Sequence, residues 1–400
     1  MKFEVNRLMM LEAAENATGV APSNSAVEVL NGILVECNDD TGEVFLTATN
    51  HEVSIQQKIM TSVAESGAML VNSRILVGMM SMLEGEFVTL SADNPGLLTV
   101  TGGRCTYQVK CLPPKSYPKP IMPFPEESVI MTGICSLAKR TAFTVSKDDS
   151  KPSLQCVQVK LKNNAVHAAA CDGMRMMLVR DIADSPDERE FLLPGRSLKT
   201  LAAISSDDDV FEVGDIGNEI VFVRGDMIFA IRKLVTGEYM DTAAVIKNIN
   251  PDYSAVVDSG KLKEALSFIS VGALADNTKT PINFVMASGE IVLRCSNDYS
   301  EVSTAVAANV SKDTPSAGFF YDVSALIKLF QVMMGKIKIE VDTKGFMLIK
   351  TRSEVYLQLP MRAPVTKDKP AKQDKNSSQS EHKGKEPKRA KGTKGVKNVA

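Results

Sequence analysis

The sequence predicts an α+β fold built from three tandem copies of one unit, each with antiparallel sheets and two helices. A short apolar strand followed by an amphipathic helical stretch occurs near the start of the chain, again at residue 129 and again at residue 255. A second helical stretch and several alternating strands follow in the same order each time. Self-similarity of this kind indicates a repeat architecture, so we interpret the chain as three related domains.

The first helix of each copy is preceded by a residue that favours helix N-caps. The stretches FEVNRLMMLEAAENA, VIMTGICSLAKRTAF and AVVDSGKLKEALSFI place Asn6, Thr132 and Asp258 before the helix, at offsets of 126 and 126 residues. The side chains of Asn, Thr and Asp accept hydrogen bonds from the first N–H groups of a helix. We therefore predict that all three helices begin just after these residues.

A second helix and further strands complete each copy. Helical stretches recur at residues 71–83, 193–205 and 321–333. Each is followed by two stretches that alternate apolar and polar residues, the pattern of half-buried antiparallel strands.

A polar turn lies between two alternating strands in each copy, as TNHEVS, CDGMRM and SNDYSE. Asn occupies the first and third turns where Asp172 occupies the second, and Asn and Asp both tolerate turn conformations. Gly173 permits a positive φ. The turn therefore repeats, whereas Met174, Arg175 and Met176 belong to the second copy alone.

Proline marks the boundaries between copies, in PPKSYPKPIMPFPEE (113–127) and NINPDYS (248–254). Past Pro364 the chain has almost no large apolar residues, which predicts disorder. We therefore expect three domains, at residues 1–122, 123–248 and 249–363, followed by a basic disordered tail at 364–400.

The formal net charge of −2 is divided unevenly. Residues 365–400 hold 11 Lys or Arg and 4 Asp or Glu, a net of +7, so the rest of the chain carries −9. An acidic body with a basic tail indicates a nucleic-acid or acidic partner. A tail that only keeps the protein in solution remains the alternative.

The composition also excludes several classes of protein. No apolar run reaches the ~20 residues of a membrane span, and Glu4, Arg7 and Glu12 interrupt any signal peptide, so we expect a cytoplasmic protein. The 7 cysteines form no CxxC pair, which indicates reduced thiols, and the 3 histidines are far apart. We expect no metal and no cofactor.

Within this repeat, three local motifs resemble those of the bacterial DNA sliding clamp, the beta subunit of the replicative DNA polymerase III. The family's Thr-Asp-Gly-His-Arg-Leu turn is matched by Cys-Asp-Gly-Met-Arg-Met at 171–176. Its Lys-Leu-Val-Asp-Gly segment is matched by Lys-Leu-Val-Thr-Gly at 233–237, and its final Pro-Met-Arg by residues 360–362. The resemblance covers residues 1 to about 363.

The resemblance implies a ring of two head-to-tail subunits that encircles duplex DNA and has no catalytic activity of its own. Such a ring tethers the catalytic subunit of the replicative polymerase to its template. An ATP-driven clamp loader, a separate assembly, opens and closes it. Its implied partners are double-stranded DNA, a second copy of the chain, the polymerase, the loader and other proteins with clamp-binding motifs.

A ring that slides must bind phosphates without reading bases, through weak electrostatic contacts. Basic residues on or beside the recurring helices suit this role, although each alone is equally consistent with a solvated helix face. The candidates for DNA binding are Arg7, Arg74, Lys139, Arg140, Lys147, Lys151, Arg196 and Lys199, with Lys261 and Lys263 beside them.

The resemblance also implies a groove between the second and third domains that binds linear peptides with a glutamine and apolar anchors. Flexible methionines suit a surface that repacks around different partners, although they are equally typical of a core. By position, the groove residues are Leu154, Cys171, Gly173, Met174, Arg175, Met176, Met240, Ala244, Val245, Leu357, Gln358, Leu359, Pro360, Met361 and Arg362.

The chain departs from the family pattern at several of these positions. Met174 replaces a histidine, Cys171 a threonine and Met240 a proline, while Gln358 interrupts an apolar pair. Peptide preference is therefore expected to differ from the common motif. The basic tail is a further departure, and we hypothesise that it contacts DNA or modulates access to the groove.

The resemblance implies a dimer interface between the first domain of one subunit and the third domain of the other. Phe268, Ala273 and Leu274 are its expected apolar contributors, although a helix face there is also typical of a core.

Two other functions remain open on the sequence alone. An enzyme would use Cys171 as a nucleophile, with Asp172 nearby and Arg175 supplying positive charge. No P-loop is present for ATP hydrolysis. A repeat scaffold with a nucleic-acid-binding tail, and no ring, is the other alternative.

Overall fold

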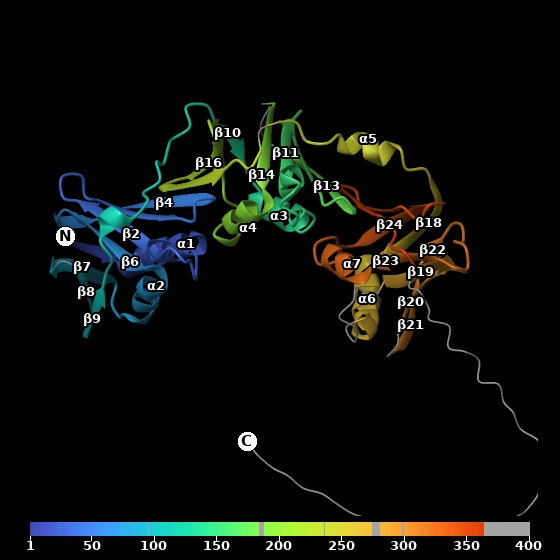
Figure 1. The fold of residues 1–400 in the computed structure, drawn as a ribbon, viewed down its shortest axis with the longest axis horizontal. Helices are drawn as coiled ribbons and strands as arrows, with labels where there is room; N and C mark the ends of the chain where they lie inside the picture. The colour runs from blue at the N-terminus through green and yellow to red at the C-terminus, as the bar shows by residue number, and fades with distance from the viewer. Residues whose placement is uncertain (95, 184–187, 236, 274–280, 298–299, 364–400) are drawn as a thin grey trace, which may run out of the picture. The chain divides into compact units, whose positions relative to one another are not determined.

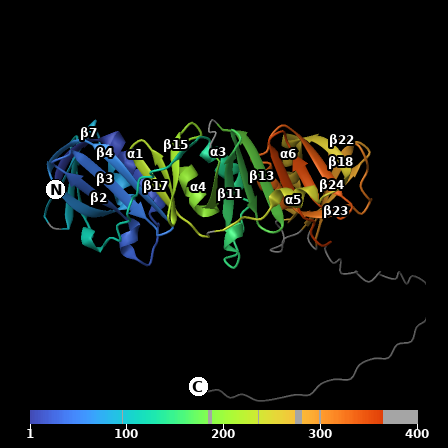
Figure 2. The ribbon, with the colours of Figure 1, turned by 90° about the horizontal axis from the view of Figure 1, so that it is seen from above.

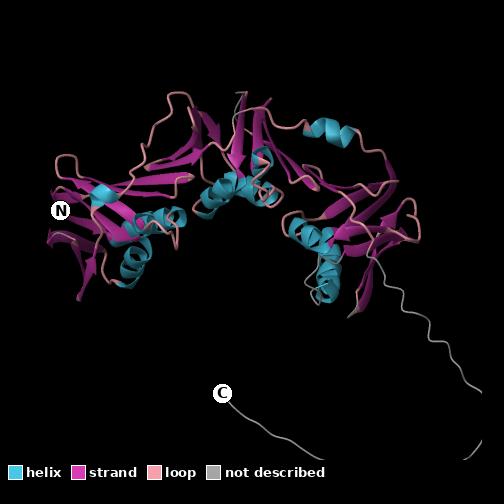
Figure 3. Ribbon diagram, viewed as in Figure 1, coloured by secondary structure: helices cyan, strands magenta, loops and turns pink. Residues whose placement is uncertain are grey.

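The computed structural model describes residues 1–94, 96–183, 188–235, 237–273, 281–297 and 300–363. Residues 1–363 form one compact unit of helices and strands (Figures 1 and 3). The α+β fold with a threefold repeat is confirmed by the order of the elements. The predicted disordered tail lies outside the described residues.

The first repeat begins with a strand that leads directly into a capped helix. The Asn6 side chain accepts hydrogen bonds from the N–H groups of Leu8 (3.0 Å) and Met9 (3.3 Å), as predicted. The elements are β1 (Lys2–Asn6), α1 (Arg7–Val20), the 3-10 helix η1 (Glu28–Asn31), β2 (Gly32–Asn38), β3 (Glu43–Thr49), β4 (Val53–Met60), β5 (Ser62–Glu65), β6 (Gly67–Asn72), α2 (Ser73–Met82), β7 (Phe87–Asn94), β8 (Leu97–Gly102) and β9 (Cys105–Lys110).

The second repeat follows a connection that contains η2 (Pro114–Ser116). Here the predicted N-cap, Thr132, is wrong: the helix begins at Ile134 after Gly133, whose φ of 66° is left-handed and whose position lacks a side-chain cap. The elements are β10 (Val129–Met131), α3 (Ile134–Thr141), η3 (Pro152–Gln155), β11 (Cys156–Lys162), β12 (Ala165–Cys171), β13 (Arg175–Ile182), β14 (Arg189–Pro194), α4 (Gly195–Ala203), β15 (Phe211–Ile216), β16 (Glu219–Arg224) and β17 (Met227–Arg232).

The third repeat follows the short helix α5 (Thr242–Lys247). Asp258 accepts a hydrogen bond from the N–H of Lys261 (3.1 Å) at the start of its first helix, as predicted. The elements are β18 (Pro251–Asp258), α6 (Ser259–Ala273), β19 (Pro281–Ala287), β20 (Glu290–Ser296), β21 (Glu301–Ala307), β22 (Asn309–Val310), β23 (Phe319–Asp322), α7 (Val323–Leu329), β24 (Lys336–Asp342), β25 (Met347–Lys350) and β26 (Glu354–Gln358).

Two large sheets run across the boundaries between repeats. The eight-stranded sheet has the order β10-β15-β16-β17-β4-β3-β2-β6, and its strands β17, β4, β3 and β2 run side by side in Figure 2. The nine-stranded sheet has the order β14-β11-β12-β13-β26-β25-β24-β18-β22. Phe229 of β17 is paired with Ile55 of β4, and Arg175 of β13 with Gln358 of β26. Backbone hydrogen bonds therefore continue from each repeat into the next.

Two smaller sheets belong to single repeats. The first repeat holds a five-stranded sheet in the order β5-β1-β7-β8-β9, and the third holds a four-stranded sheet in the order β21-β20-β19-β23. Strands β9 and β21 each lie at one end of their sheet. Among the described residues, each of these two strands therefore has one open edge.

The main core lies between the helices and the sheets. The two helices of each repeat pack together, as α1 with α2, α3 with α4 and α6 with α7. Met10, Ala13, Ala14 and Ala17 follow the i, i+3, i+4, i+7 spacing of one helix face, and all four are buried. This packing leaves the opposite face of the nine-stranded sheet free for a second, smaller cluster.

Candidate partner-binding site and basic surface

The turn between β12 and β13 is held by one carboxylate. Oδ1 of Asp172 accepts hydrogen bonds from the N–H groups of Met174 (2.9 Å) and Arg175 (2.8 Å), and the Asp172 N–H donates to the carbonyl of Arg175 (3.1 Å). Gly173 has a φ of 92°, a conformation that glycine adopts without a Cβ penalty. The turn therefore projects Met174 outward, and Met174 is 48% exposed.

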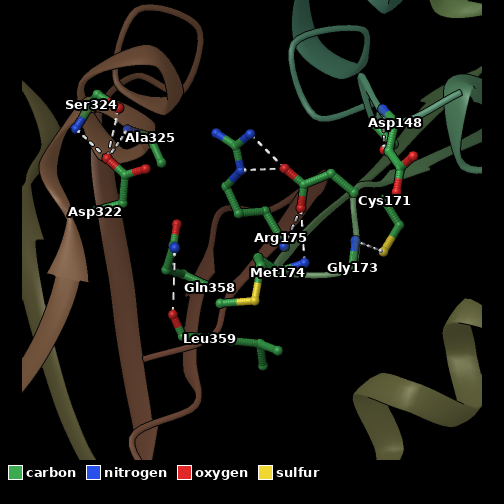
Figure 4. A network of polar contacts seen from close by, with 12 residues as sticks. Asp148, Cys171, Gly173, Met174, Arg175, Asp322, Ser324, Ala325, Gln358 and Leu359 are labelled. Carbon is green, nitrogen blue, oxygen red and sulfur yellow. Dashed lines mark hydrogen bonds and ion pairs between the residues drawn. The ribbon is translucent and has the colours of Figure 1, made fainter. Parts of the chain in front are cut away.

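The same carboxylate also fixes the Arg175 guanidinium (Figure 4). Oδ2 of Asp172 accepts from Nε of Arg175 at 2.8 Å and from its NH2 nitrogen at 2.5 Å, a two-point contact. Burial would lower the pKa of Arg175, but the hydrogen bonds and charge of Asp172 outweigh it and raise that pKa. Arg175 is therefore a fixed, permanently charged part of the surface.

An apolar cluster lies beside this turn, on the face of the nine-stranded sheet that α5 covers. Cys171, Met176 and Leu357 are buried in it, together with Ile249 and Leu348. Leu154, Val245 and Leu359 are partly buried and pack against it. Six predicted groove residues therefore meet in one cluster, and the buried ones form its floor.

The chain after β26 lies against the turn. The N–H of Leu359 donates to the carbonyl of Met174 at 2.9 Å, and the N–H of Met361 donates to the carbonyl of Phe320 at 2.7 Å. Pro360 lies between them without an N–H. The segment of residues 359–361 is thereby anchored at two points, with Arg362 exposed beyond them.

Two further predicted groove positions, Met240 and Ala244, are exposed. The exposed fraction of Met240 is 38%. The alternative that the methionines are core residues applies to Met176, which is 2% exposed, but not to Met174 or Met240.

Gln358 does not reach the surface. It is 2% exposed, its Oε1 accepts the Tyr356 hydroxyl proton at 2.6 Å, and its Nε2 donates to the carbonyl of Leu359 at 3.4 Å. A polar residue in this apolar strand is therefore satisfied internally, by Tyr356 and by the Leu359 carbonyl, and Figure 4 shows the contact with Leu359.

The environment of Cys171 is unsuited to a nucleophile. Burial raises the pKa of its thiol, the Gly173 N–H donates to its sulfur at 3.3 Å, and the nearby Asp172 charge raises the pKa further. A reactive cysteine requires a lowered pKa. The enzyme alternative thus lacks support at its proposed nucleophile.

Two of the predicted DNA-binding residues are already engaged within the chain. Arg7 donates to the carbonyls of Met80 (2.9 Å) and Gly85 (3.2 Å). The Arg140 guanidinium forms ion pairs with Asp181 and Glu354, and its side chain is only 15% exposed. We therefore remove Arg140 from the DNA-binding set, because a phosphate would have to displace two carboxylates.

The other predicted cations are exposed at their helices and at the loop that follows α3. Lys139 lies 3.9 Å from Asp207 in an open ion pair. The remaining predicted DNA-binding residues form no ion pair with any residue that the structure describes. They are Arg74, Lys147, Lys151, Arg196 and Lys199.

The predicted dimer contacts lie at the end of α6. Phe268 is 58% exposed, and Val271 on the same helix, which the sequence interpretation missed, is 68% exposed. Ala273 is the last residue of α6, whereas Leu274 lies outside the described residues.

The roles of Asp172 and Tyr356 in holding the site were also missed. An Asp three residues before an Arg, with Gly between them, was the available signal for the first. The second is a contact within one strand, since Tyr356 and Gln358 lie two residues apart on β26, and the alternation of that strand was the available signal.

The described residues contain no cluster of ligands suited to a metal ion. Among the described helices, none is long and apolar enough to cross a membrane.

The chain is similar in sequence to beta sliding clamps of several bacteria. The beta sliding clamp of Staphylococcus aureus is 23% identical over 318 residues, which cover 76% of this chain and 82% of the relative. That of Staphylococcus epidermidis is 22% identical over 320 residues, with the same coverage of 76% and 82%. The prediction of a non-catalytic subunit is confirmed by these relatives, which are named as clamps.

Solved structures share the fold. The DNA polymerase beta subunit of Streptococcus pyogenes superposes with a TM-score of 0.80 at 20% identity, covering 91% of this chain and 100% of that one. The polymerase sliding clamp of Bacillus subtilis gives a TM-score of 0.80 at 19% identity, with the same coverage of 91% and 100%. At this identity the likeness concerns the fold alone.

Two family models match the sequence over more than half of its length. The N-terminal domain of the DNA polymerase III beta subunit matches residues 1–122, and the central domain of that subunit matches residues 131–241. The chain therefore belongs to the family of the bacterial DNA polymerase III beta subunit, the beta sliding clamps.

Proposed function

We propose that two copies of this chain close head to tail into a ring that encircles duplex DNA and tethers replication proteins to it. The observation that carries the proposal is the pair of open sheet edges, β9 in the first repeat and β21 in the third. An open edge presents unpaired backbone groups to another strand. In a head-to-tail dimer, β9 of one copy meets β21 of the other and leaves both edges paired.

Side chains at the two edges suit such a contact. Strand β9 ends in Lys110 and follows Arg104, whereas β21 begins with the exposed Glu301. Phe268 and Val271 lie on α6, which packs against β20 and β21. Backbone pairing, opposite charges and an apolar patch therefore occur together, as in stable interfaces with an apolar centre and a polar rim.

The mass of the protein in dilute solution tests the ring. We expect sedimentation at nanomolar concentration to give twice 43.3 kDa. Neighbouring residues of a strand direct their N–H groups to opposite sides, so either Ser303 or Thr304 directs its N–H group to the open edge. Proline at that one of the two positions should yield monomers, because it removes the N–H group that would pair across the interface. Ser303→Ala is the matched control and should remain dimeric. A wild-type monomer would instead favour the scaffold without a ring.

We further propose that exposed cations on the helices face the DNA. Arg74 is on α2, Lys139 on α3, and Arg196 and Lys199 are on α4. Contacts to phosphates carry no base specificity and weaken as salt rises. We expect weak, salt-dependent binding to short linear duplexes and long retention on closed circles. Equal retention on linear and circular DNA would contradict encirclement.

The partner site is proposed to take peptides with a glutamine and apolar anchors. Its floor is the cluster of Cys171, Met176 and Leu357, and Met174 and Arg175 stand at its edge. A Gln-Leu-x-Leu-Phe peptide should bind the wild-type chain and bind more weakly to Arg175→Ala and to Met361→Ala. Unchanged affinity in both variants would refute this location. We propose that such peptide motifs occur in the polymerase, the clamp loader and repair proteins.

A further inference from the structure

Outside the partner site, the described residues enclose a cavity of about 870 Å³ between elements of the first and second repeats. Its walls are the turn at 50–52, the segment 142–147 after α3, the start of α4 and the segment 232–234 after β17. The N–H of Arg232 donates to the carbonyl of Glu52 at 2.9 Å and joins two of these walls. This backbone hydrogen bond thus ties the turn of the first repeat to the segment after β17.

The cavity is strongly basic. Its lining has one acidic residue, Glu52, against the cations Lys147, Arg196, Lys199, Arg232 and Lys233. Lys233 is engaged by Asp215 and by the carbonyl of Gly217. The other four cations form no ion pair with any described residue, and all four are exposed. Four positive charges are therefore available to one ligand.

The pKa of Lys199 is lowered in this crowded group of positive charges. Burial lowers the pKa of its ammonium group, and the charges of Lys147 and of Lys328 on α7 lower that pKa further. Like charges held together disfavour their own charged forms. An anion in the cavity would relieve this repulsion.

One part of the lining is apolar. Phe143, Val145 and Leu234 lie among the lining residues, and Leu234 is 45% exposed. Aromatic faces beside basic side chains are how proteins hold unpaired nucleotides. The cavity also falls in the range of roughly 300–1,000 Å³ typical of small-molecule sites.

We propose that this cavity binds a single nucleotide unit, with its phosphates on Lys147, Arg196, Lys199 and Arg232 and its base against Phe143 and Leu234. The nucleotide is either free in solution or the end of a single DNA strand. The inference rests on the proposed function only in sharing Lys147, Arg196 and Lys199 with the surface proposed to face duplex DNA. Arg232 is not among the predicted DNA-binding residues and therefore separates the two, although it also lines a smaller cavity beside Pro118 and Asn218.

The test uses the full chain and three probes: dATP, inorganic tripolyphosphate and an oligothymidylate of eight nucleotides. Calorimetry or fluorescence anisotropy at low salt should detect binding of dATP or of the oligonucleotide, and tripolyphosphate should bind more weakly than dATP because it lacks a base. Binding of dATP alone assigns the site to free nucleotides, and binding of the oligonucleotide alone assigns it to single strands.

Arg232→Glu should weaken nucleotide binding about tenfold or more, because a charge-assisted contact to phosphate becomes repulsive. Arg232→Gln should give a smaller loss and guards against a folding defect. Lys336→Glu, the same charge change at an exposed residue of β24, is the matched control and should have little effect.

The proposal is overturned if none of the three probes binds, or if Arg232→Glu and Lys336→Glu weaken binding equally. Retention on circular DNA is measured in parallel. If the wild-type protein is not retained on circular DNA but binds nucleotide, the ring is rejected and the nucleotide site stands. If it is retained but binds no nucleotide, only the nucleotide site is rejected.

Discussion

The polar turns of the first and second repeats have the same geometry and different chemistry. In the first, Oδ1 of Asn50 accepts from the N–H groups of Glu52 and Val53, both at 2.9 Å, and the Asn50 N–H donates to the carbonyl of Val53 at 3.1 Å. Asp172 makes the equivalent three bonds at 2.9, 2.8 and 3.1 Å. The residue that follows has positive φ in both turns, 72° at His51 and 92° at Gly173.

The difference lies in the second oxygen. Oδ2 of Asp172 binds the Arg175 guanidinium, whereas the corresponding atom of Asn50 is an amide nitrogen, which carries no charge and accepts no hydrogen bond. The third repeat keeps the backbone bonds, with Oδ1 of Asn297 accepting from the N–H of Ser300 at 2.8 Å. The comparison indicates that the repeat supplies a common turn and that one charged atom adapts the second copy to hold an arginine.

Removing the whole side chain should have the largest effect. Asp172→Ala leaves two backbone N–H groups and the Arg175 guanidinium without their acceptor, and Asp172 is only 15% exposed. Buried groups left unsatisfied cost about 1–3 kcal/mol each, and the exposed Met174 N–H can bind water instead, so we expect the free energy of unfolding to fall by roughly 2–4 kcal/mol. Urea unfolding measures this, and peptide binding should be lost. A loss below about 1 kcal/mol would contradict the role of the carboxylate.

Removing only the charge should separate the role of Asp172 in the turn from its role in holding Arg175. Asp172→Asn keeps the acceptor that Asn50 provides in the first repeat, so we expect a loss of about 1 kcal/mol in unfolding free energy, from the missing charge-assisted bond. Peptide affinity should nevertheless fall toward that of Arg175→Ala, and the double variant should be no worse than either single one. Independent, additive losses in this cycle would show that Asp172 does not act through Arg175.

Asn50→Asp is the matched control. It introduces the same atom in the first repeat, where the three residues that follow include no arginine. Its effect on stability should stay within about 0.5 kcal/mol, because Asn50 is only half-buried and the new carboxylate keeps the Oδ1 acceptor. Peptide binding should be unchanged.

Substitutions at the residue with positive φ should have opposite effects in the two turns. A Cβ at Gly173 would meet no atom within 4 Å, so Gly173→Ala is opposed only by the backbone conformation, at a cost of about 1–2 kcal/mol. His51→Gly should raise stability slightly or leave it unchanged, because it removes the same strain in the first repeat. Thermal unfolding compares the two, and a destabilised His51→Gly would indicate that the imidazole makes a needed contact.

Much of this comparison was available from the sequence. The three turns, two of the three helix caps and the element order follow local rules, since Asn6 and Asp258 act only on the residues that follow them. Thr132 failed because Gly133 adopts a left-handed conformation that moves the start of the helix. The neighbouring residue, not the propensity of Thr, decided that cap.

The parts of the site that depend on contacts across repeats were beyond the sequence. Arg140 looked like a free helix cation, but Asp181 and Glu354 lie 41 and 214 residues away and hold it. Gln358 looked like a break in an apolar surface, but alternation along β26 directs it to Tyr356 and away from the surface. The charge of Arg140 is visible in the sequence, whereas its two carboxylate partners are brought to it by the packing of distant segments.

A small effect is also expected at the residue before each turn. Oγ1 of Thr49 accepts from the N–H of His51 at 3.1 Å, and Sγ of Cys171 accepts from the N–H of Gly173 at 3.3 Å. The thiol thus takes the place of a hydroxyl as a local acceptor. Cys171→Thr should change the unfolding free energy by less than about 1 kcal/mol and leave peptide affinity intact.

Because burial raises the pKa of the Cys171 thiol, little thiolate is present near neutral pH, and alkylation by iodoacetamide should be slow there. The exposed Cys105 should be modified first. Loss of an assayed activity in Cys171→Thr, or rapid alkylation of Cys171 in the folded protein, would support a nucleophilic role for this residue. The second turn would then differ from the first in having a reactive residue.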